Sequence, residues 1–125
     1  MLTKLEIKST RDTPFVLFDP ENNVFEINGN SLPENTNHFF DPILAWIDNY
    51  IKTPNKTTHL ICDFEYFNSS SAKMIYNIFL ELEKINESKN KIHVTWYYEI
   101  GDDLIEEKGL EYKSILNIPF VLKKK

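Results

Sequence analysis

The chain has 125 residues, 42% of them hydrophobic, and a formal net charge of -5. This length and apolar content suit a single domain, residues 1–125, with its own hydrophobic core, and they exclude a disordered chain. Arg11 is the only arginine, so the guanidinium groups that read phosphates and guanine edges are nearly absent, and nucleic acid is a poor candidate partner. No stretch reaches the roughly 18 apolar residues of a membrane span, so we expect no membrane partner and a cytoplasmic protein.

Two apolar segments early in the chain, residues 15–19 and 24–27, flank Pro20-Glu21-Asn22-Asn23. Proline and asparagine favour tight turns, so this pattern predicts a β-hairpin. Residues 2–7 alternate loosely in polarity and predict another strand before it. The chain is therefore expected to open with antiparallel strands.

The first helix is expected between residues 40 and 51, where apolar residues recur at helical spacing. Asp41-Pro42 predicts an N-cap followed by proline at the first helical position. Asn35 or Thr36 would instead begin an earlier turn that Pro42 kinks. The sequence leaves both starts open.

The rest of the chain alternates between strands and helices. The patterns predict a buried strand over residues 57–64, an amphipathic helix ending near Asn90, a strand over 92–98, a helix capped by Asp102 or Asp103, and a last strand over 118–122. Strand-helix-strand units of this length form right-handed crossovers between parallel strands. We therefore expect an α/β fold: a mixed sheet with the hairpin at one side, packed against about three helices that cover its apolar faces.

A run of small polar residues, Asn68-Ser69-Ser70-Ser71, stands where a buried strand ends and an amphipathic helix begins. The free N–H groups and the positive dipole of a helix N-terminus favour an anion by about 0.3–1 kcal/mol, so a phosphoryl group on one serine could be housed there. These residues could instead only cap the helix, for about 1 kcal/mol. Composition alone favours the capping interpretation.

Four segments of the chain stand out together: residues 32–36 (LPENT), 66–73 (YFNSSSAK), 96–99 (WYYE) and 118–120 (IPF). In sequence and order they resemble the SiaC-like bacterial regulatory phosphoproteins, distant structural relatives of the anti-sigma-factor antagonist (STAS) domains. The resemblance spans most of the chain. It implies a STAS-like fold and a regulatory role without catalytic residues or a cofactor.

In that family the hydroxyl residue directly after the asparagine of the strand-to-helix turn is the phosphoacceptor, commonly threonine. The corresponding position here is Ser69, with Ser70 and Ser71 as alternatives. The resemblance also implies a partner switch. A cognate Ser/Thr kinase adds the phosphate, a PP2C-like phosphatase removes it, and the unphosphorylated form binds and stimulates a diguanylate cyclase or another output protein.

The partner-binding surface is expected to include Glu34, Asn35, Asn68 and Ser70, which belong to the resembling segments. Tyr97 is a further candidate. Successive side chains of a strand point to opposite faces, so Tyr97 points away from the apolar side of its strand. It is then either covered by a helix or exposed to a partner, for which aromatic residues are common anchors.

Acidic residues near the serines allow other interpretations. Asp63 and Glu65 would give a phosphate like-charged neighbours, which would disturb a partner docked over the turn. With Asp102 and Asp103 they could also bind Mg²⁺, which makes a small metal-dependent enzyme the third interpretation. The second is a constitutive interaction module or anti-sigma antagonist whose serines only cap the helix. The preferred interpretation is a phosphorylation-controlled binding module.

Overall fold

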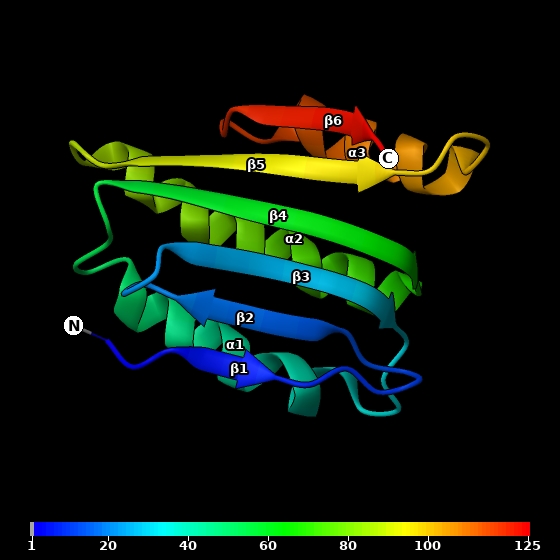
Figure 1. The fold of residues 1–125 in the computed structure, drawn as a ribbon, viewed down its shortest axis with the longest axis horizontal. Coiled ribbons are helices and arrows are strands. Elements are labelled where there is room, and N and C mark those ends of the chain that lie inside the picture. Colours follow the sequence, from blue (N-terminus) through cyan, green and yellow to red (C-terminus); the bar gives the residue numbers. More distant parts are fainter. Residues whose placement is uncertain (1) are drawn as a thin grey trace.

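The computed structural model describes residues 2–125, and the strands in that range form one six-stranded sheet in sequential order (Figure 1). The strands are β1 (Leu5–Ile7), β2 (Phe15–Asp19), β3 (Val24–Ser31), β4 (Thr57–Phe67), β5 (Lys91–Tyr98) and β6 (Phe120–Lys124). The helices are α1 (Thr36–Tyr50), α2 (Ser69–Glu83) and α3 (Asp103–Ile115), and a 3₁₀ turn, η1 (Lys84–Glu87), follows α2. The expected mixed α/β fold is confirmed.

Strand direction divides the sheet into two parts. β1, β2 and β3 pair antiparallel, whereas β3, β4, β5 and β6 run parallel. The predicted hairpin joins β2 to β3. Its turn is held by Asp19, whose Oδ2 accepts a hydrogen bond from Asn22 Nδ2 at 2.8 Å, and Asn23 adopts a φ of 55°. Asparagine tolerates this left-handed conformation better than most residues.

All three helices of the described residues lie on one side of the sheet, behind it in Figure 1. The expectation that helices cover the apolar faces of the sheet therefore holds for one face only. The parallel strands follow one another in one direction, and right-handed crossovers in one direction place every helix on the same side. The fold has two layers, and one face of the sheet is left open.

Helix α1 begins earlier than its proline suggested. Asn35 is the N-cap, and its side chain accepts a hydrogen bond from the backbone N–H of His38 at 3.0 Å. Pro42 lies inside the helix, so the alternative start at Asn35 or Thr36 is the correct one. Strand β4 also extends beyond its predicted end at residue 64, to Phe67, so that only Asn68 separates it from the serines.

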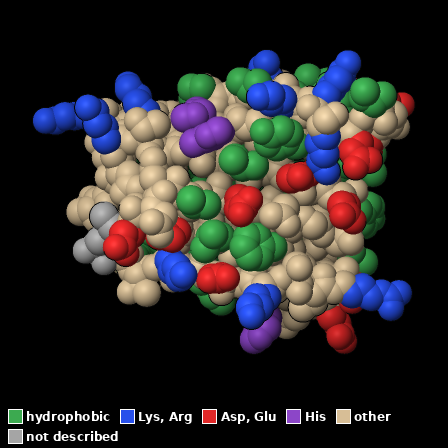
Figure 2. All heavy atoms as spheres, viewed as in Figure 1, with side chains coloured by type: hydrophobic (Ala, Val, Ile, Leu, Met, Phe, Trp, Pro, Cys, Tyr) green, Lys and Arg blue, Asp and Glu red, His purple; other side chains and the backbone are tan. Residues whose placement is uncertain are grey.

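The open face of the sheet carries a mixture of side-chain types. Figure 2 shows hydrophobic side chains among acidic, basic and histidine side chains over the strands. Tyr97 lies on this face because successive strand residues alternate and its neighbour Trp96 points into the core. The Tyr97 side chain is half-buried. The imidazole rings of His59 and His93, from β4 and β5, stack with their centroids 4.2 Å apart. None of the helices within residues 2–125 covers Tyr97, because all of them lie on the other side of the sheet.

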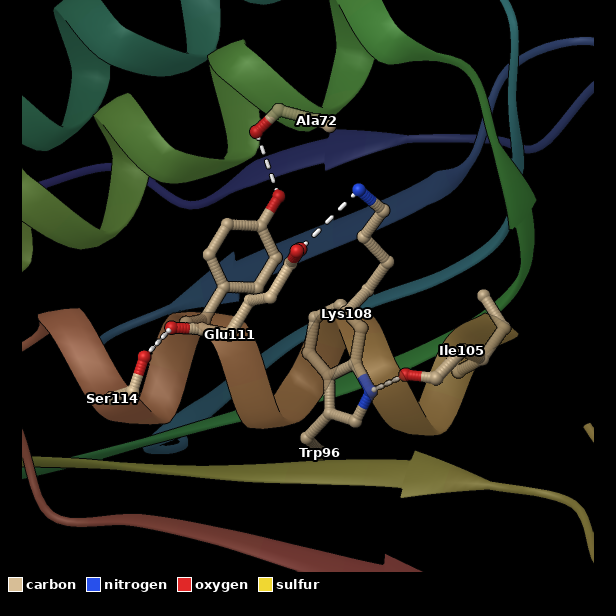
Figure 3. Close-up of polar contacts among 7 residues, drawn as sticks. Ala72, Trp96, Ile105, Lys108, Glu111 and Ser114 are labelled. Carbon is tan, nitrogen blue, oxygen red and sulfur yellow. Dashed lines mark hydrogen bonds and ion pairs between the residues drawn. The ribbon is translucent and has the colours of Figure 1, made fainter. Parts of the chain in front are cut away.

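Trp96 attaches α3 to the sheet. Its side chain is fully buried, and Nε1 donates a hydrogen bond to the carbonyl oxygen of Ile105 at 2.9 Å (Figure 3). Gly109 lies directly over the indole: a Cβ at that position would be 2.5 Å from Cδ1 and 2.6 Å from Nε1 of Trp96. The glycine that weakens the helix locally is what allows the helix to approach the sheet.

We expect Gly109→Ala to destabilise the protein although alanine is the better helix former. Alanine gains about 1 kcal/mol of helix propensity, but forcing a methyl group into a packed interior costs about 1–3 kcal/mol. Urea unfolding should show a net loss of up to about 2 kcal/mol. Lys113→Ala, at an exposed position of the same helix, is the matched control. A more stable Gly109→Ala would contradict the close packing of α3 on Trp96.

Candidate functional site

Three helices begin at the edge of the sheet where the parallel strands end. Each has an N-cap whose side-chain oxygen accepts a backbone hydrogen bond three residues later: Asn35 from His38, Asn68 from Ser71, and Asp102 from Ile105. The caps satisfy N–H groups that have no partner within the helix. The positive ends of three helix dipoles therefore lie along one edge of the molecule.

The serine run sits at this edge, and Ser71 is its structural member. Ser71 is fully buried, and its hydroxyl accepts a hydrogen bond at 2.8 Å from the hydroxyl of Ser31, which is also fully buried at the end of β3. The backbone N–H of Ser71 donates to Asn68 Oδ1 at 2.9 Å. This serine joins the start of α2 to the neighbouring strand.

Ser70 and Ser69 are exposed but differ in their contacts. The Ser70 hydroxyl lies 2.8 Å from the hydroxyl of Thr36 and donates to Asn68 Oδ1 at 3.2 Å, so it connects α2 to the start of α1. Within residues 2–125, the Ser69 hydroxyl makes no hydrogen bond, although it occupies the first position of α2. Of the three serines, Ser69 is the one that is exposed and whose hydroxyl has no hydrogen bond within the described residues.

The serine turn lies between two surface grooves. The α1-side groove, of about 860 Å³, is formed by Thr13, the loop before α1, the first turn of α1 and Ser70. The α3-side groove, of about 370 Å³, is formed by the end of β4, the start of α2 and the first turns of α3, and Ser69 belongs to it. Neighbouring serines thus face different grooves.

A family model described as "SiaC family regulatory phosphoprotein" matches residues 7–125, nearly the whole chain. The chain belongs to this SiaC family. A curated relative, an uncharacterised protein of Pseudomonas aeruginosa strain UCBPP-PA14, is 23% identical over 97% of this chain and 96% of its own.

Solved structures of SiaC from Pseudomonas aeruginosa share the fold. Apo-SiaC matches with a TM-score of 0.87 at 23% identity, over 98% of this chain and 99% of its own. SiaC in complex with the diguanylate cyclase SiaD, whose activator it is, matches with a TM-score of 0.89 at 23% identity, over 97% of this chain and 99% of that one. The sheet and helices described above are therefore those of the SiaC fold.

The structure brings together most of the side chains expected to contact a partner of this SiaC-family chain. Glu34, Asn35 and Ser70 line the α1-side groove, and Asn68 lines the α3-side groove with Ser69. Tyr97 is separated from them because it lies on the open face of the sheet, on the side away from the helices. The sequence pattern correctly predicted that Tyr97 points away from the apolar side of its strand. It did not reveal that this face of the sheet is the one opposite the helices and the serine turn.

The acidic residues do not form the cluster that the third interpretation, a small metal-dependent enzyme, requires. Asp63 lies on the open face, where its Oδ1 pairs with Lys125 Nζ at 2.6 Å, while Asp102 caps α3. In the described part of the chain, no three His, Cys, Asp or Glu side chains gather as a metal site requires. Cys62 is buried, and this burial raises the pKa of its thiol far above the usual range, so it packs as an apolar residue.

Sequence reasoning missed the α3 residues of the α3-side groove, including the pair Leu104 and Lys108. They are four residues apart and so lie on the same side of α3, outside the stripe of Ile105, Gly109 and Tyr112 that faces the core. An exposed leucine four residues before a lysine is too common a pattern to indicate a site.

We expect substitutions in the turn to show the different roles of its residues. Ser71→Ala should lower the free energy of unfolding by about 1–3 kcal/mol, because it leaves the buried Ser31 hydroxyl unpaired. Asn68→Ala should cost about 1 kcal/mol through the lost cap. Ser69→Ala should change stability by less than about 0.5 kcal/mol. Urea unfolding measures the loss in free energy of unfolding for each variant. Equal losses for Ser69→Ala and Ser71→Ala would contradict the structural role assigned to Ser71.

Proposed function

We propose that this SiaC-family chain is a partner-switching protein controlled by phosphorylation of Ser69 and has no catalytic activity of its own. In its unphosphorylated form it binds and stimulates a diguanylate cyclase, and the phosphate releases the cyclase. Family membership supports the regulatory role, and the SiaC structure solved with the cyclase SiaD supports the kind of partner. The observation that carries the choice of residue is the free, exposed Ser69 hydroxyl at the start of α2.

The other two serines suit the acceptor role less well. Ser71 is fully buried and paired with Ser31, so a kinase would have to unfold the turn to reach it. Ser70 is exposed, but phosphorylation would break its contacts with Thr36 and with the cap residue Asn68. Phosphorylation of Ser69 disturbs neither the cap nor the link to α1.

The start of α2 can accommodate the added charge. The first turns of α1 and α2 contain no acidic residue, and the helix dipole stabilises an anion there by about 0.3–1 kcal/mol. The expected repulsion by Asp63 is weakened, because Asp63 lies on the open face and pairs with Lys125. The phosphate therefore acts mainly on the partner, which would have to bury a charge of about -1.5 to -2.

The switch requires two enzymes besides the output protein. We infer a cognate Ser/Thr kinase and a PP2C-like phosphatase, which act on the exposed turn in opposite directions. Both must reach Ser69, and its position between two grooves leaves it accessible. We also infer a cytoplasmic location, because the kinase needs ATP. None of the helices within residues 2–125 is long and apolar enough to cross a membrane.

The proposed function predicts which residue is modified. After incubation with ATP and the cognate kinase from the native host, intact-mass and fragment analysis should find one phosphate, on Ser69. Ser69→Ala should abolish it, whereas Ser70→Ala should retain it. Phosphate found only outside residues 69–71 would overturn the assignment.

The second prediction concerns the effect of charge on the output partner. Ser69→Asp should weaken binding to the host's diguanylate cyclase at least about tenfold, because burying an uncompensated charge costs several kcal/mol and 1.4 kcal/mol is one decade of affinity. Ser69→Ala should bind at least as tightly as the unmodified protein. Calorimetry measures affinity, and circular dichroism checks the fold. If Ser69→Asp and Ser69→Ala bind equally, the protein is a constitutive binding module.

A further inference from the structure

The open face of the sheet has no helix against it within residues 2–125, although four of its strands, β3 to β6, run parallel (Figure 1). Parallel strands occur almost only in sheets that are covered on both faces, whereas antiparallel sheets commonly leave one face in water. The antiparallel strands β1 and β2 can therefore remain exposed. The parallel part of the open face has the character of a surface that a further layer covers.

One row of side chains crosses this face from β2 to β6. The strand registers place five residues side by side, in strand order Leu17, Glu26, Ile61, Thr95 and Val121. Each alternates along its own strand with residues of the core, so all five point outwards. The two ends and the centre of the row are apolar, and one polar residue lies between each end and the centre. The row therefore has the same pattern in both directions from β4.

The net charge of the molecule lies on its helices. α1, α2 and α3 together contain eight acidic residues and three lysines, a net charge of -5 that equals the net charge of the whole chain. Two copies that met through their helices would bring these like charges together and repel each other. The helix side is therefore a poor surface for contact between copies of this chain.

The charged side chains on and beside the open face nearly balance. They are five acidic residues and four lysines: Glu6, Glu26, Asp63, Glu65, Glu99, Lys4, Lys91, Lys123 and Lys125. Several are already paired, since Lys4 lies 3.6 Å from Glu6 and Lys125 lies 2.6 Å from Asp63. The open face is thus the side on which a second copy meets the least repulsion.

We propose that the open face is a docking surface for a second copy of this chain, which packs against it with its own open face about a twofold axis along β4. A twofold axis requires a self-complementary patch, and the row across the sheet provides one. At the axis Ile61 of one copy lies against Ile61 of the other. Leu17 approaches Val121, and Glu26 approaches Thr95. Apolar side chains therefore meet apolar ones, and polar side chains meet polar ones.

Asp63 also lies on β4 and so comes close to the axis. Its Oδ1 pairs with Lys125 Nζ, so each copy brings a lysine together with its carboxylate. The two Asp63 side chains then meet as compensated pairs and not as bare like charges. The axis leaves both helix layers on the outside and both serine turns accessible at the same end of the dimer, so the inference does not depend on the proposed function.

The size of the face indicates how strong the dimer is. Strands lie about 4.8 Å apart and rise about 3.3 Å per residue, so the five strands β2 to β6, of about seven residues each, cover roughly 24 by 23 Å. Two such faces bury about 1,100 Å² in total, which is at the weak end of specific interfaces. We therefore expect a reversible dimer that forms at micromolar concentrations and above.

The first test measures the mass of the full chain by sedimentation equilibrium between about 5 and 500 µM, where the average should rise from one chain towards two. Val121→Asp should weaken association at least about tenfold, because the added carboxylate would lose its water at the interface. Val121 is 57% exposed, and the matched control is Ile115→Asp on α3, where the residue is 58% exposed. The control should associate as the unmodified protein does. Circular dichroism confirms that each variant is folded.

A cross-link tests the position of the axis. Two copies of the Ile61→Cys variant should be joined by a short bismaleimide, because facing sheets lie about 10 Å apart and residue 61 meets its counterpart at the axis. The Ile115→Cys variant should not be joined under the same conditions. The native Cys62 is buried in both variants and does not compete for the reagent.

Each outcome either supports or overturns the dimer. A chain that stays monomeric up to about 500 µM overturns it and leaves the open face to a different partner. Equal losses for Val121→Asp and Ile115→Asp mean association through another surface, which also overturns it. A loss confined to Val121→Asp supports the open face, and a missing cross-link in Ile61→Cys would then overturn only the axis along β4. Phosphate analysis at Ser69 tests the proposed function separately.

Discussion

The contact between Trp96 and α3 is the constraint on which the candidate site depends. The buried indole of Trp96 donates a hydrogen bond to the backbone carbonyl of Ile105. Gly109 packs directly against the same indole ring. These contacts fix how close α3 lies to the sheet, while Tyr112 fixes its separation from α2. The groove beside Ser69 is the space between α2 and α3 that the Tyr112 side chain does not fill. An interior packing contact thus determines the shape of an exposed surface.

The order of the strands determines where such a surface can arise. Parallel strands in sequential order place all crossovers on one side, and they gather the helix N-termini at one edge. Three N-caps therefore lie near one another although Asn35 and Asp102 are far apart in sequence. Ligands of open α/β sheets commonly bind at the carboxyl ends of the strands. Here that edge carries the exposed serines Ser69 and Ser70, each of which lines one of two grooves.

Local patterns in the sequence predicted the local features well. The hairpin, the strand of alternating residues around Trp96 and the cap of α3 each depend on neighbouring residues. The structure has the first two where expected, and it chooses Asp102 from the two candidate caps, Asp102 and Asp103. Features that depend on distant residues could not be read in this way. Ser69 and Ser71 are chemically identical in the sequence, and only the position of Ser31, forty residues earlier, makes one of them structural. The groove likewise depends on tertiary spacing.

The hydrogen bond between Ser31 and Ser71 also means that the serines accessible before folding differ from those accessible after it. In an unfolded chain the three serines are equally accessible, and a kinase that recognised only the local peptide could modify any of them. A phosphate on Ser71 would then have to enter a fully buried position, and the chain could not complete its core. Once β3 and α2 have packed together, the Ser71 side chain is buried and inaccessible to a kinase. Folding therefore removes Ser71 from the serines that a kinase could reach and leaves only Ser69 and Ser70 exposed.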